Sequence, residues 1–504
     1  MLNLQNIFRI THLSVNRQQH ETQQTPFAHF RLPRTAAKWV RLASIAASPL
    51  VLFACVQPNT NSGDNQQTPP PAKVAAYYQW TQLNGRGQLS ARVITSAEQC
   101  PKLRIDQQQL SMQARTSRAG RPPGFEAVMV CQATIPPGVA YASINGLQLP
   151  LPPNSQDSTQ NIEANDNHWR KIAVLGDTGC RVAGRNIQNC TGASGYGPAW
   201  NFAGVADAVE RQQSDLIIHV GDYHYREHGK CDARCLQENV GYTWESWQVD
   251  FFEPAKSLLG QAPWVFIRGN HEDCHRSWKG WFYFFDEQDL PASPNWSDSA
   301  CQNYTPIQII PLGQRQLALL DSSSIPSVYD TPDPKQVAQF QRQFDQLFAD
   351  SRGRPTWFIA HHPVWGVSSF NTNNPDISAL EITLQQALKQ SRYGHFPDHI
   401  EMLLAGHVHL FEALPFTDRR PTQFVFGGGG TKLSPSISQQ LINEHPSVLT
   451  ALNIQSDELS TFHQFDYGII DIMPGEQLRV SVHSLDAESE TPGPFIVRHK
   501  GALR

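Results

Sequence analysis

Five short motifs of the sequence combine small residues with side chains that bind metal ions. They read Gly-Asp-Thr-Gly, Gly-Asp-Tyr-His-Tyr, Gly-Asn-His-Glu, His-His-Pro and Gly-His-Val-His. Their candidate metal ligands are Asp177, Asp222, Tyr225, Asn270, His361, His407 and His409. This set is too large for one ion but suits two ions about 3.5 to 4 Å apart that share one carboxylate. Two such ions neutralise phosphate oxygens and supply a hydroxide near neutral pH, so the motifs indicate hydrolysis of phosphate esters.

Each motif follows an apolar run that is typical of a buried strand. The five runs are 172–175, 216–220, 264–267, 357–360 and 402–405. Between them, residues 200–213 and 334–350 carry apolar side chains at helical spacing. Alternating strands and helices predict an α/β domain, in which side chains at the carboxyl ends of strands converge on one crevice. A single Gly-Asp or His-x-His is a common turn or accident, but all five after apolar runs indicate one site.

The motif order GDxG, GDxxY, GNH(E/D), HxP and GHxH resembles that of the purple acid phosphatases in the calcineurin-like metallophosphoesterase superfamily. The resemblance covers residues 171–485 and implies a two-sheet αββα sandwich. It implies a first metal held by Asp177, Asp222, Tyr225 and His409 and a second held by Asp222, Asn270, His361 and His407. Asp222 is then the bridge. The resemblance also implies that His271 and His362 stand in the outer shell, where they bind phosphate and protonate the leaving oxygen.

Tyr225 is the most discriminating of these residues. A phenolate is a hard, electron-rich donor that favours a trivalent ion, and the resemblance implies Fe³⁺ with a violet charge-transfer band. The second site, with Asn and two His, suits Zn²⁺, Fe²⁺ or Mn²⁺. A trivalent ion acidifies its bound water more than a divalent one, so we expect an acid pH optimum.

The residues outside the motifs predict a chain of several parts. Basic residues followed by an apolar stretch over 42–54 indicate a leader at 1–55, and the low-complexity residues 56–73 indicate a disordered tether. Residues 74–153 predict a small all-β domain that is similar to the fibronectin-like domain of the larger plant enzymes. Residues 154–167 form a polar linker, and the α/β catalytic domain spans 168–490.

The end of the leader, Leu-Phe-Ala-Cys, resembles a bacterial lipobox in which Cys55 is lipidated. Simple cleavage, an uncleaved anchor and no export remain alternatives. The favoured reading is a periplasmic protein or a lipoprotein attached to the outer membrane. Eight other cysteines fit four disulfides, with local pairs the simplest of 105 pairings. A cysteine zinc site is disfavoured because no pair of CxxC motifs occurs.

The composition of the chain limits the classes of molecule that it is expected to bind. The net charge of −5 gives no basic field, so nucleic acid is not expected, and the expected partner is a small phosphorylated substrate. Membrane contact is expected only through a lipid or an N-terminal anchor, and no oligomeric state is indicated. The leading interpretation is a phosphomonoesterase of acid phosphatase type. A phosphodiesterase or nucleotidase with the same site, and a non-catalytic binding lipoprotein, are the alternatives.

Several residues near the motifs match no ligand of the resembling family. His219 and His224 are expected to pack, and His275 and Arg276 are expected on a solvated loop. The glycine run 427–430 has no P-loop spacing and is expected to form a turn.

Overall fold

The computed structural model describes residues 76–153, 169–183, 186–191, 198–227, 240–325, 331–369, 377–486 and 488–497. The leader, the tether and the linker expected from the sequence lie outside these residues. All described residues belong to one compact unit, 70–504. None of the helices in this described part is long and apolar enough to cross a membrane.

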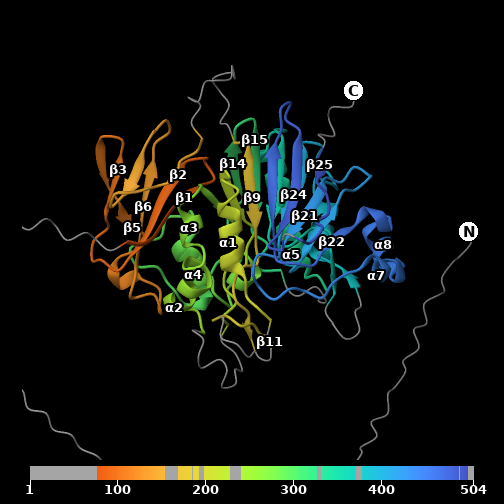
Figure 1. Ribbon diagram of the computed structural model, residues 1–504, viewed down its shortest axis with the longest axis horizontal. Helices are drawn as coiled ribbons and strands as arrows, with labels where there is room; N and C mark the ends of the chain where they lie inside the picture. The colour runs from red at the N-terminus through yellow and green to blue at the C-terminus, as the bar shows by residue number, and fades with distance from the viewer. Residues whose placement is uncertain are drawn as a thin grey trace, which may run out of the picture. The chain divides into compact units, whose positions relative to one another are not determined.

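The unit is built on two large β-sheets (Figure 1). The first has ten strands in the order β25 (Phe495–Val497), β24 (Leu478–Ser484), β23 (Asp466–Ile472), β9 (Lys171–Leu175), β12 (Leu216–His219), β13 (Trp264–Phe266), β1 (Ala76–Leu83), β2 (Leu89–Thr95), β6 (Met129–Ile135) and β5 (Gln113–Ala114). The second has seven, in the order β14 (Gln308–Leu312), β15 (Arg315–Leu320), β16 (Thr356–Ala360), β19 (Ile400–Ala405), β21 (Thr422–Phe426), β20 (Phe411–Leu414) and β22 (Ser460–Phe462).

Shorter elements surround these sheets. The smaller strands are β3 (Lys102–Ile105), β4 (Gln108–Ser111), β7 (Ala142–Ile144), β8 (Leu147–Gln148), β10 (Val182–Ala183), β11 (Asn186–Ile187), β17 (Val367–Ser369) and β18 (Ile377–Ala379). The helices are α1 (Phe202–Glu210), α2 (Trp244–Trp247), α3 (Lys256–Leu259), α4 (Trp278–Phe284), α5 (Pro334–Asp350), α6 (Ile382–Gln390), α7 (Gln439–Glu444) and α8 (Pro446–Leu452).

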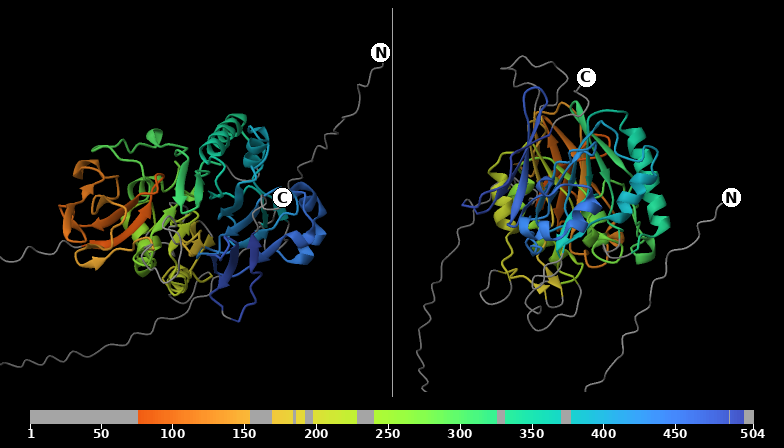
Figure 2. Two further views of the ribbon diagram at one scale, coloured as in Figure 1. Left: turned by 90° about the horizontal axis from the view of Figure 1, so that it is seen from above. Right: turned by 90° about the vertical axis from the view of Figure 1, so that its right-hand side faces the viewer.

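Side-chain alternation along the strands creates three apolar layers. In β9, Ile172 and Val174 point into a core shared with the second sheet, while Ala173 and Leu175 face α1 to α4. The second sheet packs its other face against α5 to α8. Figure 2 shows the yellow-green and the teal helices on opposite sides of the strands. The expected αββα sandwich is confirmed.

Helix α5 covers the second sheet because its sequence satisfies every local requirement of a helix. Asp333 caps it by accepting a hydrogen bond from the Lys335 N–H at 3.0 Å, and Pro334 occupies its first turn. Its apolar face, which includes Phe340 and Phe344, is fully buried. The helix spans the residues that the periodicity predicts.

The N-terminal strands differ from the separate domain that the sequence predicts. Residues 76–148 do form strands, but β1 pairs in parallel with β13, with Gln82 opposite Trp264. Strands β2, β6 and β5 then continue the first sheet outward. Arg92 of β2 is buried and donates to the carbonyls of Phe284, at 2.7 Å, and Asp286, at 3.0 Å. We call residues 76–153 the strand extension, because their strands β1, β2, β6 and β5 enlarge the first sheet, which carries three of the five motifs. The first sheet also includes residues beyond 490, the predicted end of the catalytic domain, because β25 ends at Val497.

Three disulfides join cysteines that are close in sequence, as the simplest pairing predicts. They are Cys100–Cys131, Cys180–Cys190 and Cys274–Cys301. The remaining two cysteines of the eight, Cys231 and Cys235, lie outside the described residues.

Candidate metal centre

The seven candidate ligands come together at the carboxyl ends of five strands from both sheets. Asp177 follows β9, Asp222 follows β12, Asn270 follows β13, His361 follows β16, and His407 and His409 follow β19, while Tyr225 lies on the loop after β12. Three of them have left-handed backbone conformations that are rare for residues other than glycine, with φ of 56° at Asp177, 61° at Asp222 and 72° at His407. Such strain persists where the surrounding structure enforces it, and it clusters at functional sites.

A first donor group surrounds the phenol of Tyr225. The Tyr225 Oη lies 2.9 Å from Oδ1 of Asp177, 2.8 Å from Oδ2 of Asp222 and 2.9 Å from Nε2 of His409. Asp177, Asp222 and His409 each offer a ligand atom, and these atoms lie within 4.8 Å of one another. The structure thus brings together the four residues that the sequence assigns to a first ion.

A second donor group surrounds the amide of Asn270. Its Oδ1 lies 3.0 Å from Nε2 of His361 and 2.9 Å from Nδ1 of His407. The Nε2 of His361 is 3.2 Å from Oδ2 of Asp222, the same oxygen that contacts Tyr225. Asp222, His361 and His407 again form a group within 4.8 Å. The two groups therefore share Asp222, as a bridging carboxylate requires.

The electrostatics of this cluster fit cations. Burial raises the pKa of the Asp177 carboxyl to about 8. Burial also opposes a charge on His361, but the Asp222 carboxylate outweighs it and raises the pKa of His361 to about 9. Burial lowers the pKa of His407 far below its ordinary value and that of His409 to about 3. The neutral imidazoles of His407 and His409 beside buried acceptor oxygens are a donor set that positive ions stabilise.

Backbone contacts hold the loops that carry these ligands. The buried Glu272 carboxylate accepts hydrogen bonds from the backbone N–H groups of Asp222, Tyr223 and Gly269 at 3.0 to 3.2 Å. The Asp250 carboxylate accepts the N–H of Tyr225 at 2.8 Å and pairs with Arg226. The motif loops are thus tied to one another independently of any ligand.

His271, one of the two expected outer-shell histidines, lies against the first donor group. Its ring centroid is 3.8 Å from that of Tyr225, and its Nε2 is 4.0 Å from Oδ2 of Asp222. Its Nδ1 is 2.8 Å from a carboxylate oxygen of Glu227. Glu227 lies outside the five motifs, so the sequence offers no signal for it. Glu227 orients the imidazole so that Nε2 faces the donor atoms.

His362, the other outer-shell candidate, lies beside the second donor group. Its ring centroid is 4.1 Å from that of His407, and its Nδ1 is 3.1 Å from Oγ of Ser322. Ser322 also accepts the backbone N–H of His362 at 3.0 Å. Ser322 follows β15 and belongs to no motif, so the sequence offers no signal for it.

The histidines expected to pack do so. Nε2 of His219 lies 3.0 Å from Oγ1 of Thr178, and its ring stacks on Tyr223 at 4.0 Å. The buried His224 contacts Ser246 at 3.0 Å.

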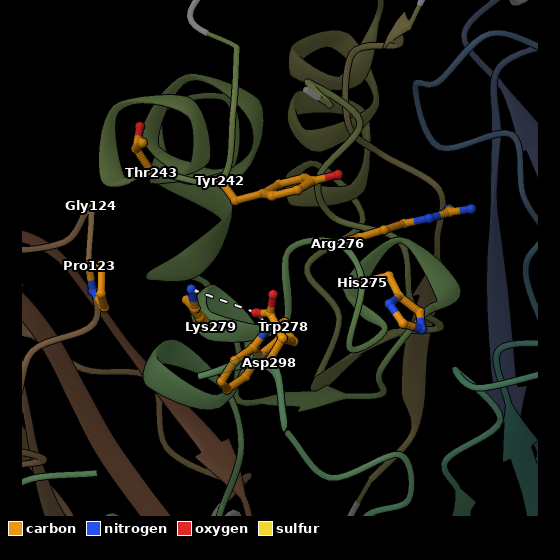
Figure 3. Close-up of a pocket in the computed structure, with 9 residues that line it drawn as sticks. All are labelled: Pro123, Gly124, Tyr242, Thr243, His275, Arg276, Trp278, Lys279 and Asp298. Atoms are coloured by element: carbon orange, nitrogen blue, oxygen red, sulfur yellow. Dashed lines mark hydrogen bonds and ion pairs between the residues drawn. The ribbon is translucent and has the colours of Figure 1, made fainter. Parts of the chain in front are cut away.

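A cavity of about 390 Å³ lies beside the turn that carries His271. Its lining residues are Pro123, Gly124, Tyr242, Thr243, His275, Arg276, Trp278, Lys279 and Asp298. Figure 3 shows Tyr242 along one side and Lys279 with Asp298 along the other. Arg276, expected on a solvated loop, lies on a turn with its side chain 34% exposed, and its Nη1 is 3.6 Å from Glu227. The Trp278 side chain is buried, so it packs in the core.

The glycine run 427–430, expected to form a turn, follows β21 with a bend at Gly429 and Gly430 and packs directly on the motifs. A Cβ at Gly427 would lie 1.9 Å from the carbonyl oxygen of Val408, and one at Gly429 would lie 2.2 Å from that of Gly176. Only glycine allows this approach between the turn and the ligand loops.

Comparisons with known proteins agree with this geometry. A family model for the calcineurin-like phosphoesterases matches residues 170–411, which include all seven candidate ligands. The structure of a purple acid phosphatase from yellow lupin (Lupinus luteus) seeds is similar in fold, with a TM-score of 0.50 and 12% identity over 84% of this chain and 74% of that one.

Two further solved structures match with lower TM-scores. PhoD has a TM-score of 0.47 and 10% identity over 83% of this chain and 88% of that one. GAP50 of Plasmodium has a TM-score of 0.38 and 11% identity over 66% and 90%. No curated protein matches the sequence. Residues 170–411 thus form a calcineurin-like phosphoesterase domain.

Proposed function

We propose that this chain hydrolyses phosphate monoesters at a site for two cations, with Asp222 as the shared ligand. The observation that carries this proposal is that Oδ2 of Asp222 lies 2.8 Å from Tyr225 Oη in one donor group and 3.2 Å from His361 Nε2 in the other. A carboxylate at this position joins two ions at the spacing that phosphoryl transfer uses. The similar fold of the lupin purple acid phosphatase supports a monoester substrate.

The donor atoms support different ions at the two positions. The first, with Tyr225 and two carboxylates, suits Fe³⁺, and the second, with Asn270, His361 and His407, suits Zn²⁺, Fe²⁺ or Mn²⁺. When bound, the two ions would polarise the phosphate and activate the attacking water. The seven ligands would keep both ions in place during this chemistry.

His271 is the side chain best placed to donate a proton to the leaving alcohol. Glu227 occupies Nδ1, so Nε2 is the nitrogen that faces the donor atoms. A proton held at Nε2 can pass to the departing oxygen, and Glu227 stabilises the imidazolium before transfer. His362 lies on the side of the second donor group, with its ring against that of His407. The neighbouring cavity offers room for the organic part of the ester.

The proposal is tested by comparing 4-nitrophenyl phosphate with its bis ester on the intact protein, with metal content measured in parallel. We expect the monoester to react faster. A faster reaction of the bis ester would replace the proposal by a phosphodiesterase. Turnover of neither ester by protein that holds two metals would favour a binding protein.

The shared role of Asp222 predicts a specific defect. Substituting Asp222→Asn removes the bridging charge and should lower the affinity for both ions, whereas Asp177→Asn should affect one. Metal analysis after dialysis measures this difference. An Asp222→Asn protein with two ions and full activity would contradict the shared role.

Export is the second part of the proposal. The leader at 1–55 and the three disulfides among the described residues are typical of proteins outside the cytoplasm. Cell fractionation of the wild type and a Cys55→Ser variant tests it. We expect the wild type in the membrane fraction and the variant released from it.

A further inference from the structure

Each ligand histidine has a second ring nitrogen, which we call the outer nitrogen, that does not face the donor groups. The contacts of this nitrogen differ among the three histidines. His361 places its Nδ1 2.8 Å from the carbonyl oxygen of Val220, and His409 places its Nδ1 2.9 Å from that of Lys432. Such acceptors fix the tautomer and the ring orientation of a metal-binding histidine. His407 uses Nδ1 toward Asn270, so its outer nitrogen is Nε2. Within the residues that the structure describes, this nitrogen has no hydrogen-bond partner.

A buried carboxyl group lies close to the His407 ring. Glu381, between β18 and α6, is 3% exposed, and its Oε1 has no hydrogen-bond partner in the described part of the chain. One of its carboxylate oxygens and one ring nitrogen each of His362 and His407 lie within 4.8 Å of one another. Among the described residues this carboxylate makes no hydrogen bond to either ring, so such a bond requires a change in the side-chain torsions of Glu381.

The backbone at Glu381 is also strained, with a φ of 61° that glycine tolerates far better. The residue begins α6 but makes no side-chain cap hydrogen bond. A strained backbone and an unsatisfied buried carboxyl both cost stability, and neither improves the helix or the core. A contribution to the neighbouring site accounts for both features.

The protons on the two histidines fit this role. A cation at Nδ1 of His407 leaves the proton on Nε2, which then needs an acceptor. Ser322 accepts the backbone N–H of His362, so its hydroxyl hydrogen is free to donate to Nδ1 of the same residue. That arrangement leaves the proton of His362 on Nε2 as well. Two N–H donors thus belong to rings that lie close to one carboxylate, and this carboxylate has no hydrogen-bond partner among the described residues.

We infer that Glu381 is a positioning residue for the second ion: its carboxylate accepts hydrogen bonds from the outer N–H groups of His407 and His362. The first bond directs Nδ1 of His407 to the ion, and the second holds the His362 ring over the same side of the site. This inference rests on the proposed function only for the presence of ions at the centre. Metal binding therefore tests it without reference to catalysis.

The decisive variant is Glu381→Gly, because glycine relieves the left-handed strain while it removes the carboxylate. Protein stripped with a chelator is titrated with Zn²⁺ by calorimetry, and its thermal unfolding is measured without metal. We expect unfolding at the wild-type temperature or above, but about 10- to 100-fold weaker binding of one of two Zn²⁺ ions. Glu381→Gln keeps an acceptor oxygen and should lose less affinity.

Glu412 provides a matched control. It is another fully buried glutamate, and both of its oxygens accept the Val367 N–H next to the same β17–β18 hairpin. Glu412→Gln should leave both Zn²⁺ affinities unchanged. The inference is overturned if Glu381→Gly keeps both affinities, or if Glu412→Gln weakens them equally. The inference is also overturned if the wild type binds a third equivalent of Zn²⁺ that Glu381→Gly does not bind, because Glu381 would then be a ligand itself. Failure of the proposed function would appear separately, as two bound ions without ester turnover.

Discussion

At the scale of single residues, the phenol of Tyr225 links three of the other candidate ligands. Its Oη is within 2.9 Å of Asp177, Asp222 and His409, and its side chain is fully buried. If Fe³⁺ occupies the first position, Tyr225→Phe should abolish the visible absorption band and leave the fold intact. Absorption spectra of iron-loaded protein measure this.

The neighbouring Tyr223 is the control for that prediction. It is equally buried, but its Oη donates to the carbonyl of Ile267 at 2.8 Å and contacts no candidate ligand. Tyr223→Phe should keep the band while it loses stability, because a buried carbonyl loses its donor. An unchanged spectrum in Tyr225→Phe would refute the iron-phenolate assignment.

The sequence predicts the residues that carry donor atoms better than the residues that hold them in place. All seven candidate ligands belong to short motifs, because each must follow a strand end directly. Glu227, Ser322 and Glu381 act through other side chains, so nothing in their spacing marks them. Their positions depend on loops that only the folded chain brings together.

At the scale of elements, the turn before Asn270 is set by a glycine. Gly269 has an ordinary φ of −93°, but a Cβ there would lie 2.1 Å from Oδ1 of Asp222 and 2.2 Å from its backbone nitrogen. Gly269→Ala must therefore displace Asp222, and a shift near 1 Å should lower kcat/KM about a hundredfold. Gly260→Ala is the control, because its Cβ would meet nothing closer than 3.6 Å, and it should leave kcat/KM unchanged. Equal activity of the two variants would contradict this.

The buried carboxyl of Glu412 on β20 makes stability depend on pH. Burial raises its pKa to about 8, so folding favours the protonated form. In the unfolded chain the pKa of Glu412 is near 4.5, so above that pH the unfolded chain loses this proton while the folded protein keeps it. The free energy of unfolding therefore falls by about 1.4 kcal/mol per pH unit until about pH 8. The Glu412→Gln variant lacks this loss.

Urea unfolding of both proteins between pH 5 and pH 8 measures the effect. The advantage of Glu412→Gln over the wild type should grow by roughly 4 kcal/mol across this range and then level off. A difference that is constant with pH would show that the carboxyl is already charged in the folded protein.

At the scale of the whole molecule, two buried arginines join the strand extension to the end of α4 and the segment after it. Arg92 donates to two carbonyls there, and Arg115 donates to those of Phe282 and Gln288 at 3.0 Å. Arg92→Met leaves buried carbonyls without donors and should cost roughly 3 kcal/mol of unfolding free energy. The exposed Arg104 is the control, and Arg104→Met should change little. Denaturant unfolding of both variants measures their free energies of unfolding. Equal values for Arg92→Met and Arg104→Met would contradict the anchoring role.

The extent of the first sheet is the feature of the fold that the sequence predicts least. The β character of residues 76–148 is local and follows from alternation and turn residues. The pairing of Gln82 with Trp264 joins residues far apart in the sequence, and no local pattern encodes that choice. Helix α5 is the opposite case, because its cap, its proline and its apolar period all lie within its own sequence.

The pairing of β1 with β13 also bears on solubility. Without β1, strand β13 would end the sheet and present unpaired N–H and C=O groups, next to the apolar side chains of Trp264 and Phe266. Bare, hydrophobic strand edges recruit strands from other molecules and lead to aggregation. The strand extension moves the edge of the sheet away from the metal-binding strands to β5, a strand of two exposed residues, Gln113 and Ala114. It thereby keeps the sheet that carries the catalytic motifs from pairing with neighbouring molecules.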